Sequence, residues 1–215
     1  MNLAALRSAV RDLTGFRMSS LVSDARIDDA VNEAYARLCA AESWSWLVSS
    51  STATVSPSAV SMPLSGCRHV LTVTLDDGNR RLLLDRASRM SPEWLDPAGS
   101  TPALYAFVPS GTLQIQPVPD KAYTCTVQYI SRPASMASTD APVFNAEYHM
   151  ALAYAAAASL LVQENDETNR PQAYLAFYAD FLDRLRIDDN RSSLAAVQMG
   201  SKPRARSRRY LAWGR

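Results

Sequence analysis

Apolar side chains recur every three or four positions near the start of the chain, as they do along one face of an α-helix. The first series consists of Leu3, Leu6, Val10 and Leu13. It stops before Gly15, so we predict a short helix that ends at a left-handed glycine. A second helix is predicted from Ser23 or Asp24, either of which can cap it, to about Trp46. Its apolar stripe is Ile27, Ala30, Val31, Ala34, Tyr35, Leu38 and Cys39.

The apolar period changes to two between residues 49 and 133, and proline and glycine punctuate this part of the chain. Such alternation predicts short antiparallel strands. The Asp-Gly-Asn string at residues 77–79 lies between two strand candidates and predicts a hairpin turn. A short helical piece from about Asp85 to Leu95 is expected to interrupt the strands, because Asp85 can cap a helix.

Helical spacing returns near residue 144. Residues 144–159 begin with aromatic side chains and continue with small ones, which allow a second helix to approach closely. The last helix is predicted to start near Pro171, since proline is favoured in the first turn of a helix. Its apolar face needs a covering element and consists of Tyr174, Phe177, Tyr178, Phe181, Leu182 and Leu185.

Helices at both ends of the chain with strands between them are most simply joined as one helical bundle that carries an insertion. The sequence therefore predicts an α+β fold. The discontinuous helical bundle is expected to comprise residues 1–48 and 144–188, and the inserted small antiparallel β module residues 49–135. The helical pattern fails from about Asp188, so residues 189–215 are expected to form an extended, basic C-terminal arm.

The charge distribution supports such an arm. The chain has a formal net charge of +1, but residues 1–190 carry 15 Lys and Arg against 21 Asp and Glu, whereas residues 191–215 carry 7 against none. The body is thus −6 and the tail +7, an asymmetry typical of an interaction tail. With 47% hydrophobic and 20% charged residues, the chain as a whole is in the range of globular proteins.

Residues with catalytic or metal-binding chemistry are sparse. Cys39, Cys67 and Cys125 show no CxxC spacing, so we expect reduced thiols and a cytosolic protein. His69 and His149 lack metal-ligand spacing and are interpreted as structural. Only seven glycines occur, and phosphate-binding and nucleophile-elbow motifs are absent. We therefore expect no catalytic residue, no cofactor and no metal.

Neither a secretory signal nor a membrane partner is expected. Arg7 and Arg11 interrupt the first apolar run, which also lacks a basic start. The longest apolar stretch, residues 150–162, is shorter than the about 20 residues that a membrane span needs, and predicts a buried helix.

Two groups of residues are candidates for a functional site. Trp44 and Trp46 lie at the boundary between helix and strands, where we expect the indoles to pack the two parts together. In the tail, arginines alternate with large apolar side chains of the kind that dominate interface energies. Such a segment either orders on a protein partner, which the aromatic residues favour, or neutralises nucleic-acid phosphates. The tail candidates are Arg204, Arg206, Arg208, Arg209, Tyr210, Leu211 and Trp213.

Several strings, taken in order, resemble the head-to-tail adaptor (connector) proteins of tailed bacteriophages, of the tail accessory factor type. The similar strings are Asn32-Glu33-Ala34, the tryptophan-rich exit at residues 42–47, the Gly-x-x-Pro-x-x-Tyr string at residues 99–105, the strand-turn-strand run at residues 113–133, and the return to helix at residues 140–161. Residues 58–63 depart from the family pattern. These strings are turn and core signatures rather than catalytic motifs.

The resemblance implies a structural virion protein at the head-to-tail junction, assembled in the host cytoplasm. It implies a dodecameric ring of this chain beneath the portal protein, through which packaged DNA passes, with a downstream tail component (nozzle or tail-tube protein) attached to it. It also implies that the C-terminal arm reaches the portal. The alternative from the residues alone is a DNA-binding protein that acts through the basic tail. An enzyme such as a cell-wall hydrolase, with a carboxylate such as Glu33 or Glu93, is a more distant alternative.

Overall fold

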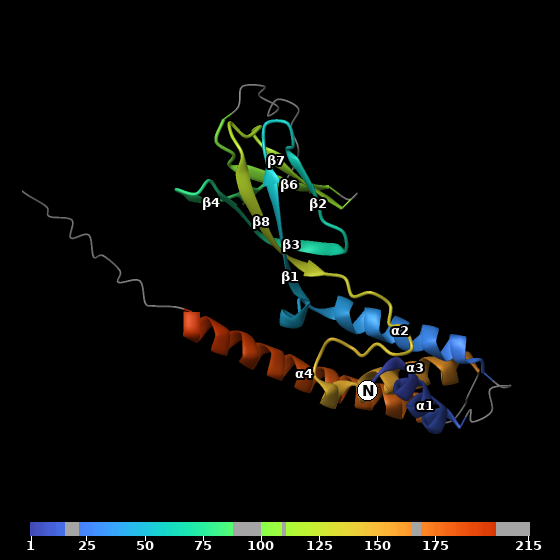
Figure 1. Cartoon of the computed structure of the whole chain (residues 1–215). Coiled ribbons are helices and arrows are strands. Elements are labelled where there is room, and N and C mark those ends of the chain that lie inside the picture. The colour runs from blue at the N-terminus through green and yellow to red at the C-terminus, as the bar shows by residue number, and fades with distance from the viewer. Residues whose placement is uncertain (16–21, 88–99, 109–110, 165–168, 201–215) are drawn as a thin grey trace, which may run out of the picture.

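Helices at the two ends of the chain enclose a region of strands in the sequence, as the computed structural model shows (Figure 1). The structure describes residues 1–15, 22–87, 100–108, 111–164 and 169–200, and side chains as far as Arg191. The α-helices are α1 (Leu3–Thr14), α2 (Asp24–Ala41), α3 (Met150–Gln163) and α4 (Arg170–Gly200). Two short 3₁₀ helices, η1 (Ser45–Leu47) and η3 (Ala146–Tyr148), precede β1 and α3.

The strands form two four-stranded sheets. The first has the order β1-β8-β3-β4 and is antiparallel throughout, with bounds Val48–Val55, Tyr123–Ser131, Cys67–Asp76 and Arg81–Leu83. The second has the order β2-β7-β6-β5, with bounds Ser61–Pro63, Thr112–Gln116, Leu104–Val108 and Asp85–Arg86, and its β5–β6 pair is parallel. The hairpin turn predicted at residues 77–79 is confirmed, since it joins β3 to β4 and Gly78 has a φ of 85°.

Two separate apolar cores hold these elements. One lies among the helices and extends to Trp44, Leu47 and Ile130 at the start of the sheet region. The other contains residues of both sheets, including Val73 of β3 and Ile115 of β7. The strands alternate between buried and exposed side chains, as strands with one covered face do. Each part therefore has its own hydrophobic stabilisation, and the helical core reaches the sheets at Leu47 and Ile130.

Local signals account for the ends of the first two helices. The Asn2 side chain accepts a hydrogen bond from the backbone N–H of Ala5, and Gly15 ends α1 with a φ of 81°. Ser23 caps α2 by accepting from the N–H of Arg26. The predicted start of each helix and the glycine stop of α1 are therefore confirmed. The second helix, however, ends at Ala41 rather than near Trp46, and η1 follows it.

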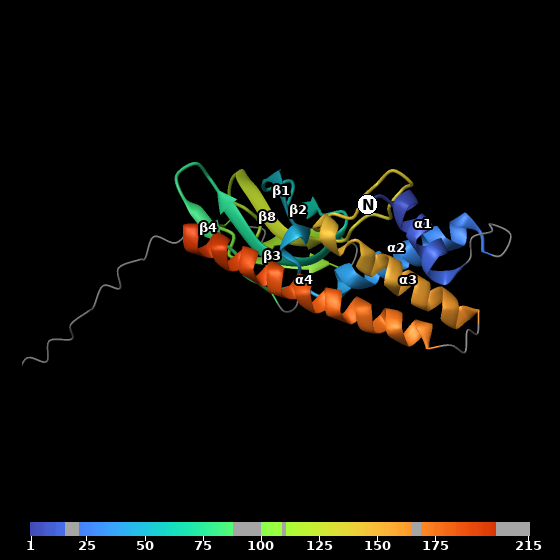
Figure 2. The same cartoon turned by 90° about the horizontal axis from the view of Figure 1, so that it is seen from below.

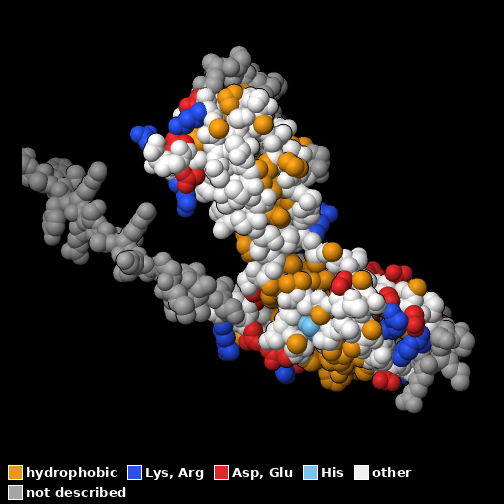
Figure 3. All heavy atoms as spheres, viewed as in Figure 1, with side chains coloured by type: hydrophobic (Ala, Val, Ile, Leu, Met, Phe, Trp, Pro, Cys, Tyr) orange, Lys and Arg blue, Asp and Glu red, His pale blue; other side chains and the backbone are white. Residues whose placement is uncertain are grey.

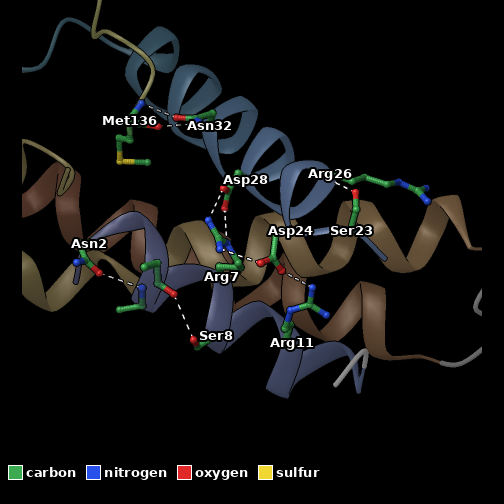
Figure 4. Close-up of polar contacts among 12 residues, drawn as sticks. Asn2, Arg7, Ser8, Arg11, Ser23, Asp24, Arg26, Asp28, Asn32 and Met136 are labelled. Carbon is green, nitrogen blue, oxygen red and sulfur yellow. Dashed lines mark hydrogen bonds and ion pairs between the residues drawn. The ribbon is translucent and has the colours of Figure 1, made fainter. Parts of the chain in front are cut away.

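A cluster of ion pairs joins α1 to α2 (Figure 4). The Nε of Arg7 donates to Asp28 at 2.8 Å, and its Nη1 lies 3.0 Å from the carboxylate of Asp24. Arg11 reaches the same Asp24 at 2.5 Å. Asp24 lies in the first turn of α2, where the helix dipole favours negative charge. The two arginines therefore fix the position of this helix start against α1.

The predicted architecture is wrong beyond the α+β class. In place of a helical bundle built from both chain ends, α3 packs against each of the other three helices, and α4 follows α3 and continues beyond it (Figure 2). In place of a small antiparallel β module there are two sheets, one of which contains a parallel pair.

Two further expectations along the chain need correction. Residues 189–200 belong to α4 rather than to an extended arm, because the sequence between Asp188 and Gly200 contains no glycine or proline and includes strong helix formers. The helical piece predicted from Asp85 is also wrong at its start, because Asp85 and Arg86 form β5. Residues 88–95 of that piece lie outside the described residues.

The buried thiols give the first testable prediction. Cys39, Cys67 and Cys125 are free and buried, and burial raises the pKa of Cys39 and of Cys125 to about 11. A rise of about two units lowers the thiolate fraction at pH 8 by about 100-fold. We expect a thiol-specific reagent to modify the folded chain at least that much more slowly than the chain in denaturant. Rapid modification of either cysteine in the folded chain would contradict the buried placement.

Candidate functional site

The connection between helices and sheets is the candidate site, and two tryptophans lie in it. Trp44 is only 1% exposed, and its indole N–H donates to the carbonyl of Leu38 at 2.8 Å. Trp46 stacks on Trp44 with ring centroids 4.6 Å apart and also contacts Phe144. Both indoles pack in the apolar core of the helices. They close that core at the point where the chain passes into β1.

An arginine from the sheet completes the end of α2. The guanidinium of Arg68, in β3, donates to the carbonyl oxygens of Cys39 at 3.0 Å, Ala40 at 2.6 Å and Glu42 at 3.2 Å. The last carbonyls of a helix have no partner within it, and the negative end of the helix dipole favours a cation there. A sheet residue thus satisfies the groups that α2 leaves unpaired, which ties β3 to the helix end.

The long helix α4 is attached at the same place. Asp189 accepts hydrogen bonds from the backbone N–H of Ser45, at 3.2 Å, and from its hydroxyl. Arg186 lies 2.5 Å from the carboxylate of Glu42, just after α2. These contacts fix α4 at the junction, and the helix continues from there for another eleven residues to Gly200. We call this group the junction: Trp44, Ser45, Trp46, Arg68, Arg186 and Asp189.

A third contact to α4 comes from a tyrosine. The hydroxyl of Tyr148, in η3, donates to Asp188, and this hydrogen bond raises the pKa of Tyr148 to about 12. Together with the contacts of Arg186 and Asp189, it determines the direction in which the C-terminal part of α4 leaves the molecule. In Figure 1 the sheets and this part of α4 diverge from the junction.

The structure describes some of the candidate residues selected from the sequence and not others. Trp44 and Trp46 lie together in the junction, whereas the seven tail candidates, Arg204 to Trp213, all lie outside the described residues. His149 is buried against main-chain oxygens of Phe144 and Met1, at 2.9 and 3.0 Å. Sequence reasoning missed Arg68 and Asp189, whose partners are distant along the chain.

The described residues give no sign of a metal site or of a membrane span. No group of three His, Cys, Asp or Glu side chains in this part of the chain is placed to hold a metal ion. Within the same residues, no helix combines the length and the apolar character that crossing a bilayer requires. The junction contacts are hydrogen bonds, ion pairs and ring packing, which position the parts of a protein.

A comparison with known families identifies the kind of protein. The model of the SU10 adaptor protein family matches residues 1–201, which include all of the helices and both of the sheets that the structure describes. The chain belongs to the SU10 adaptor protein family. This is a phage head-tail adaptor family, so the resemblance found in the sequence is confirmed and the chain has a structural role as a phage adaptor. No curated protein matches the chain.

The last residue of the match shows which parts of the structure belong to the SU10 adaptor family region. The match ends at residue 201, one residue after the end of α4. The whole junction is therefore part of the family region, including the contacts of Arg186 and Asp189 on α4. The tail candidates from Arg204 onward lie beyond it.

The attachment of α4 can be tested at Asp189. We expect Asp189→Ala to cost about 1 kcal/mol, because the Ser45 N–H and hydroxyl lose their acceptor. Hydrogen exchange should become faster in α4 amides after residue 185 while those near residue 175 change little. Asp180→Ala is the matched control, since Asp180 lies on the same helix and forms an exposed ion pair with Arg184 there. Equal exchange in both variants would show that the contact does not hold the helix.

The Tyr148 hydrogen bond predicts a pH dependence. A tyrosine whose pKa rises from about 10 in the unfolded chain to about 12 in the folded one stabilises the fold fully below pH 10. That contribution is lost as the pH rises toward 12. The difference in unfolding free energy between wild type and Tyr148→Phe should therefore be constant from pH 7 to 9 and shrink above pH 10. A difference that stays unchanged to pH 12 would refute the hydrogen bond.

Proposed function

We propose that this chain is the head-to-tail adaptor that forms a dodecameric ring beneath the portal, extends the DNA channel and provides the attachment platform for the tail. The observation that carries the proposal is the family match over residues 1–201, which includes all of the described fold. In this proposal the protein resides at the head-to-tail junction of the virion after assembly in the host cytoplasm.

The two-part layout supports contacts with two different partners. The helices and the sheets have separate cores, and they meet at the junction. A molecule of this layout can present one part to each neighbour without disturbing the other. We assign the helices to the portal side and to contacts between copies, and the sheets to the downstream tail component, a nozzle or tail-tube protein.

The C-terminal segment supports a role in portal binding. Helix α4 has 31 residues, and a basic segment that contains no acidic residue follows it in the sequence. Arginines combined with tyrosine and tryptophan are the residues that most often anchor protein interfaces. We therefore propose that the segment from Arg204 to Trp213 docks on the portal, with Trp44 and Trp46 fixing the base from which α4 extends.

The charge split is compatible with a DNA channel. Residues 1–190 have a net charge of −6, and fixed negative charge repels phosphates, so that DNA slides past such a surface rather than binding to it. The second candidate function is binding of DNA through the tail. It is favoured by the net charge of +7 on residues 191–215. The two functions differ in which partner the tail contacts.

Mass photometry with the cognate portal ring tests the proposal. We expect the full chain to add a discrete ring mass to the portal, and a chain that ends at Gly200 to lose most of this loading. Ending at Gly200 leaves α4 intact, so the loss would be due to the basic segment alone. The matched variants are one with Arg204, Arg206, Arg208 and Arg209 changed to Gln, and one with Tyr210, Leu211 and Trp213 changed to Ala.

The outcomes separate the two functions. Loss of portal loading in the aromatic variant supports protein docking through the segment. Duplex binding that falls steeply with salt and is abolished in the arginine variant, without portal loading by any chain, would favour the DNA-binding function. Equal portal loading by the full chain and the truncated chain would refute the docking role of the segment and would not affect the adaptor role.

A further inference from the structure

The first half of α4 exposes apolar side chains on two sides. Residues 173–179 contain no charged or strongly polar side chain, and Tyr174 and Tyr178 pack toward the helical core. Leu175 and Phe177 are 50% and 51% exposed. Leu175 and Phe177 are two residues apart, which corresponds to a rotation of about 200° around the axis of an α-helix. These side chains therefore lie on opposite flanks of α4. A helix that is apolar nearly all round is normally covered on all sides.

One flank borders a groove lined by small side chains. The groove, of about 360 Å³, runs between α2, α3 and α4, with Leu175 on its α4 side. The exposed ion pair between Glu33 and Arg37, at 2.5 Å, lies on its α2 side. Alanines in the groove leave space between the helix backbones, so a large side chain from outside can enter it. These alanines are Ala30, Ala34, Ala155 and Ala158.

The opposite flank carries an aromatic protrusion. Phe177 packs on Tyr154 of α3 with ring centroids 5.3 Å apart, and Tyr154 also contacts Tyr174 and Phe181. Asp180 and Arg184 lie three and seven positions after Phe177, on the same face of α4, and form an exposed ion pair at 2.8 Å. Figure 3 shows hydrophobic side chains gathered along the lower edge of the helical part.

We infer that copies of this chain associate head to tail, with Phe177 of one copy, supported from below by Tyr154, inserted into the alanine-lined groove of the next. The inference rests on the proposed ring and identifies the contact that would build it. Both surfaces belong to one chain but lie on opposite flanks of the same helix, so a copy cannot satisfy its own groove. A contact between two different surfaces leaves each bound pair with one free groove and one free Phe177, so further copies can add, and the chain of copies closes into a ring when the rotation per copy divides a full turn.

The charges around the two surfaces favour a second copy over a charged partner. Each surface carries one acidic and one basic side chain, so neither selects a nucleic acid or another strongly charged molecule. The groove has Glu33 and Arg37 at its edge, and Asp180 and Arg184 lie beside Phe177, so both surfaces offer charges of both signs around an apolar centre. Interfaces with a buried aromatic anchor and a polar rim derive most of their affinity from the anchor.

Crosslinking of cysteine variants tests the contact in the full-length chain. Ala173→Cys places a thiol one turn before Phe177 on the aromatic flank, and Ala155→Cys places one in the groove; both keep Phe177. The three native thiols are buried, so a short bismaleimide should react with the new ones. Each variant is incubated with the reagent alone, and the two are also incubated as a mixture. Each of these samples is measured in two conditions, free at high concentration and bound to the portal ring.

We expect each single variant to stay uncrosslinked and their mixture to give linked pairs. The double variant should give a ladder of linked copies. Links between two Ala173→Cys chains would mean a symmetric contact and would overturn the inference. Loading on the portal without any link would also overturn the inference while the proposed function stands. A ladder without portal loading would support the contact and count against the proposed function.

A charge placed at the centre of the contact provides a second test. Phe177→Asp should weaken self-association, measured by the mass distribution at increasing concentration, by about tenfold or more, as expected for an anchor residue. Leu83→Asp is the matched control, because Leu83 is an exposed apolar side chain in β4, away from both flanks. Circular dichroism and the melting temperature check that both variants fold. An equal effect of both variants would contradict a specific role for Phe177.

Discussion

The last carbonyl groups of α2 have no partner within the helix, and the way in which they find donors determines how the two parts of the molecule are joined. Arg68 of β3 donates to two of these oxygens, those of Cys39 and Ala40, and to the carbonyl of Glu42, which directly follows the helix. A planar guanidinium presents its N–H groups in a fixed fork, so one side chain can reach several carbonyls only in a narrow range of orientations. The sheet that contains Arg68 is therefore held at a defined angle to α2. Leu47 and Ile130 extend the helical core to the start of the sheet region, and the hydrogen bonds of Arg68 add a directional constraint to this apolar contact.

The same short region also receives α4. Ser45 binds Asp189, and Glu42 binds Arg186, so residues that directly follow α2 contact a helix almost 150 positions away in the sequence. Trp44 and Trp46 flank Ser45 in the sequence, and their stacked rings add an apolar base to this region. The end of one helix, the beginning of the sheet region and the middle of another helix thus meet in one place. A family whose members connect two partners needs such a fixed geometry, because a flexible joint would not hold the partners in line.

How far the sequence predicts this arrangement depends on how local each signal is. The start of α1 and its stop at Gly15 follow from spacing and glycine chemistry within a few residues. Alternation in the strands shows which side chains are buried but not which strand pairs with which, so the division into two sheets could not be predicted. The extension of α4 to Gly200 was missed because the apolar helical spacing stops near Asp188, although no glycine or proline interrupts the chain before Gly200. Arg68 and Asp189 were missed because their partners lie up to 144 positions away, and no local pattern indicates them.

The length of α4 also gives the charge split a physical meaning. The acidic body and the basic C-terminal segment attract each other, and a flexible segment that began at Asp188 would start beside Asp188 and Asp189 themselves. The helix instead carries the chain from Asp189 to Gly200, a rise of about 16 Å along its axis. This is about twice the Debye length of about 8 Å at physiological ionic strength, over which exposed charges are screened. The helical extension therefore separates the origin of the basic segment from Asp188 and Asp189, which would otherwise directly precede it.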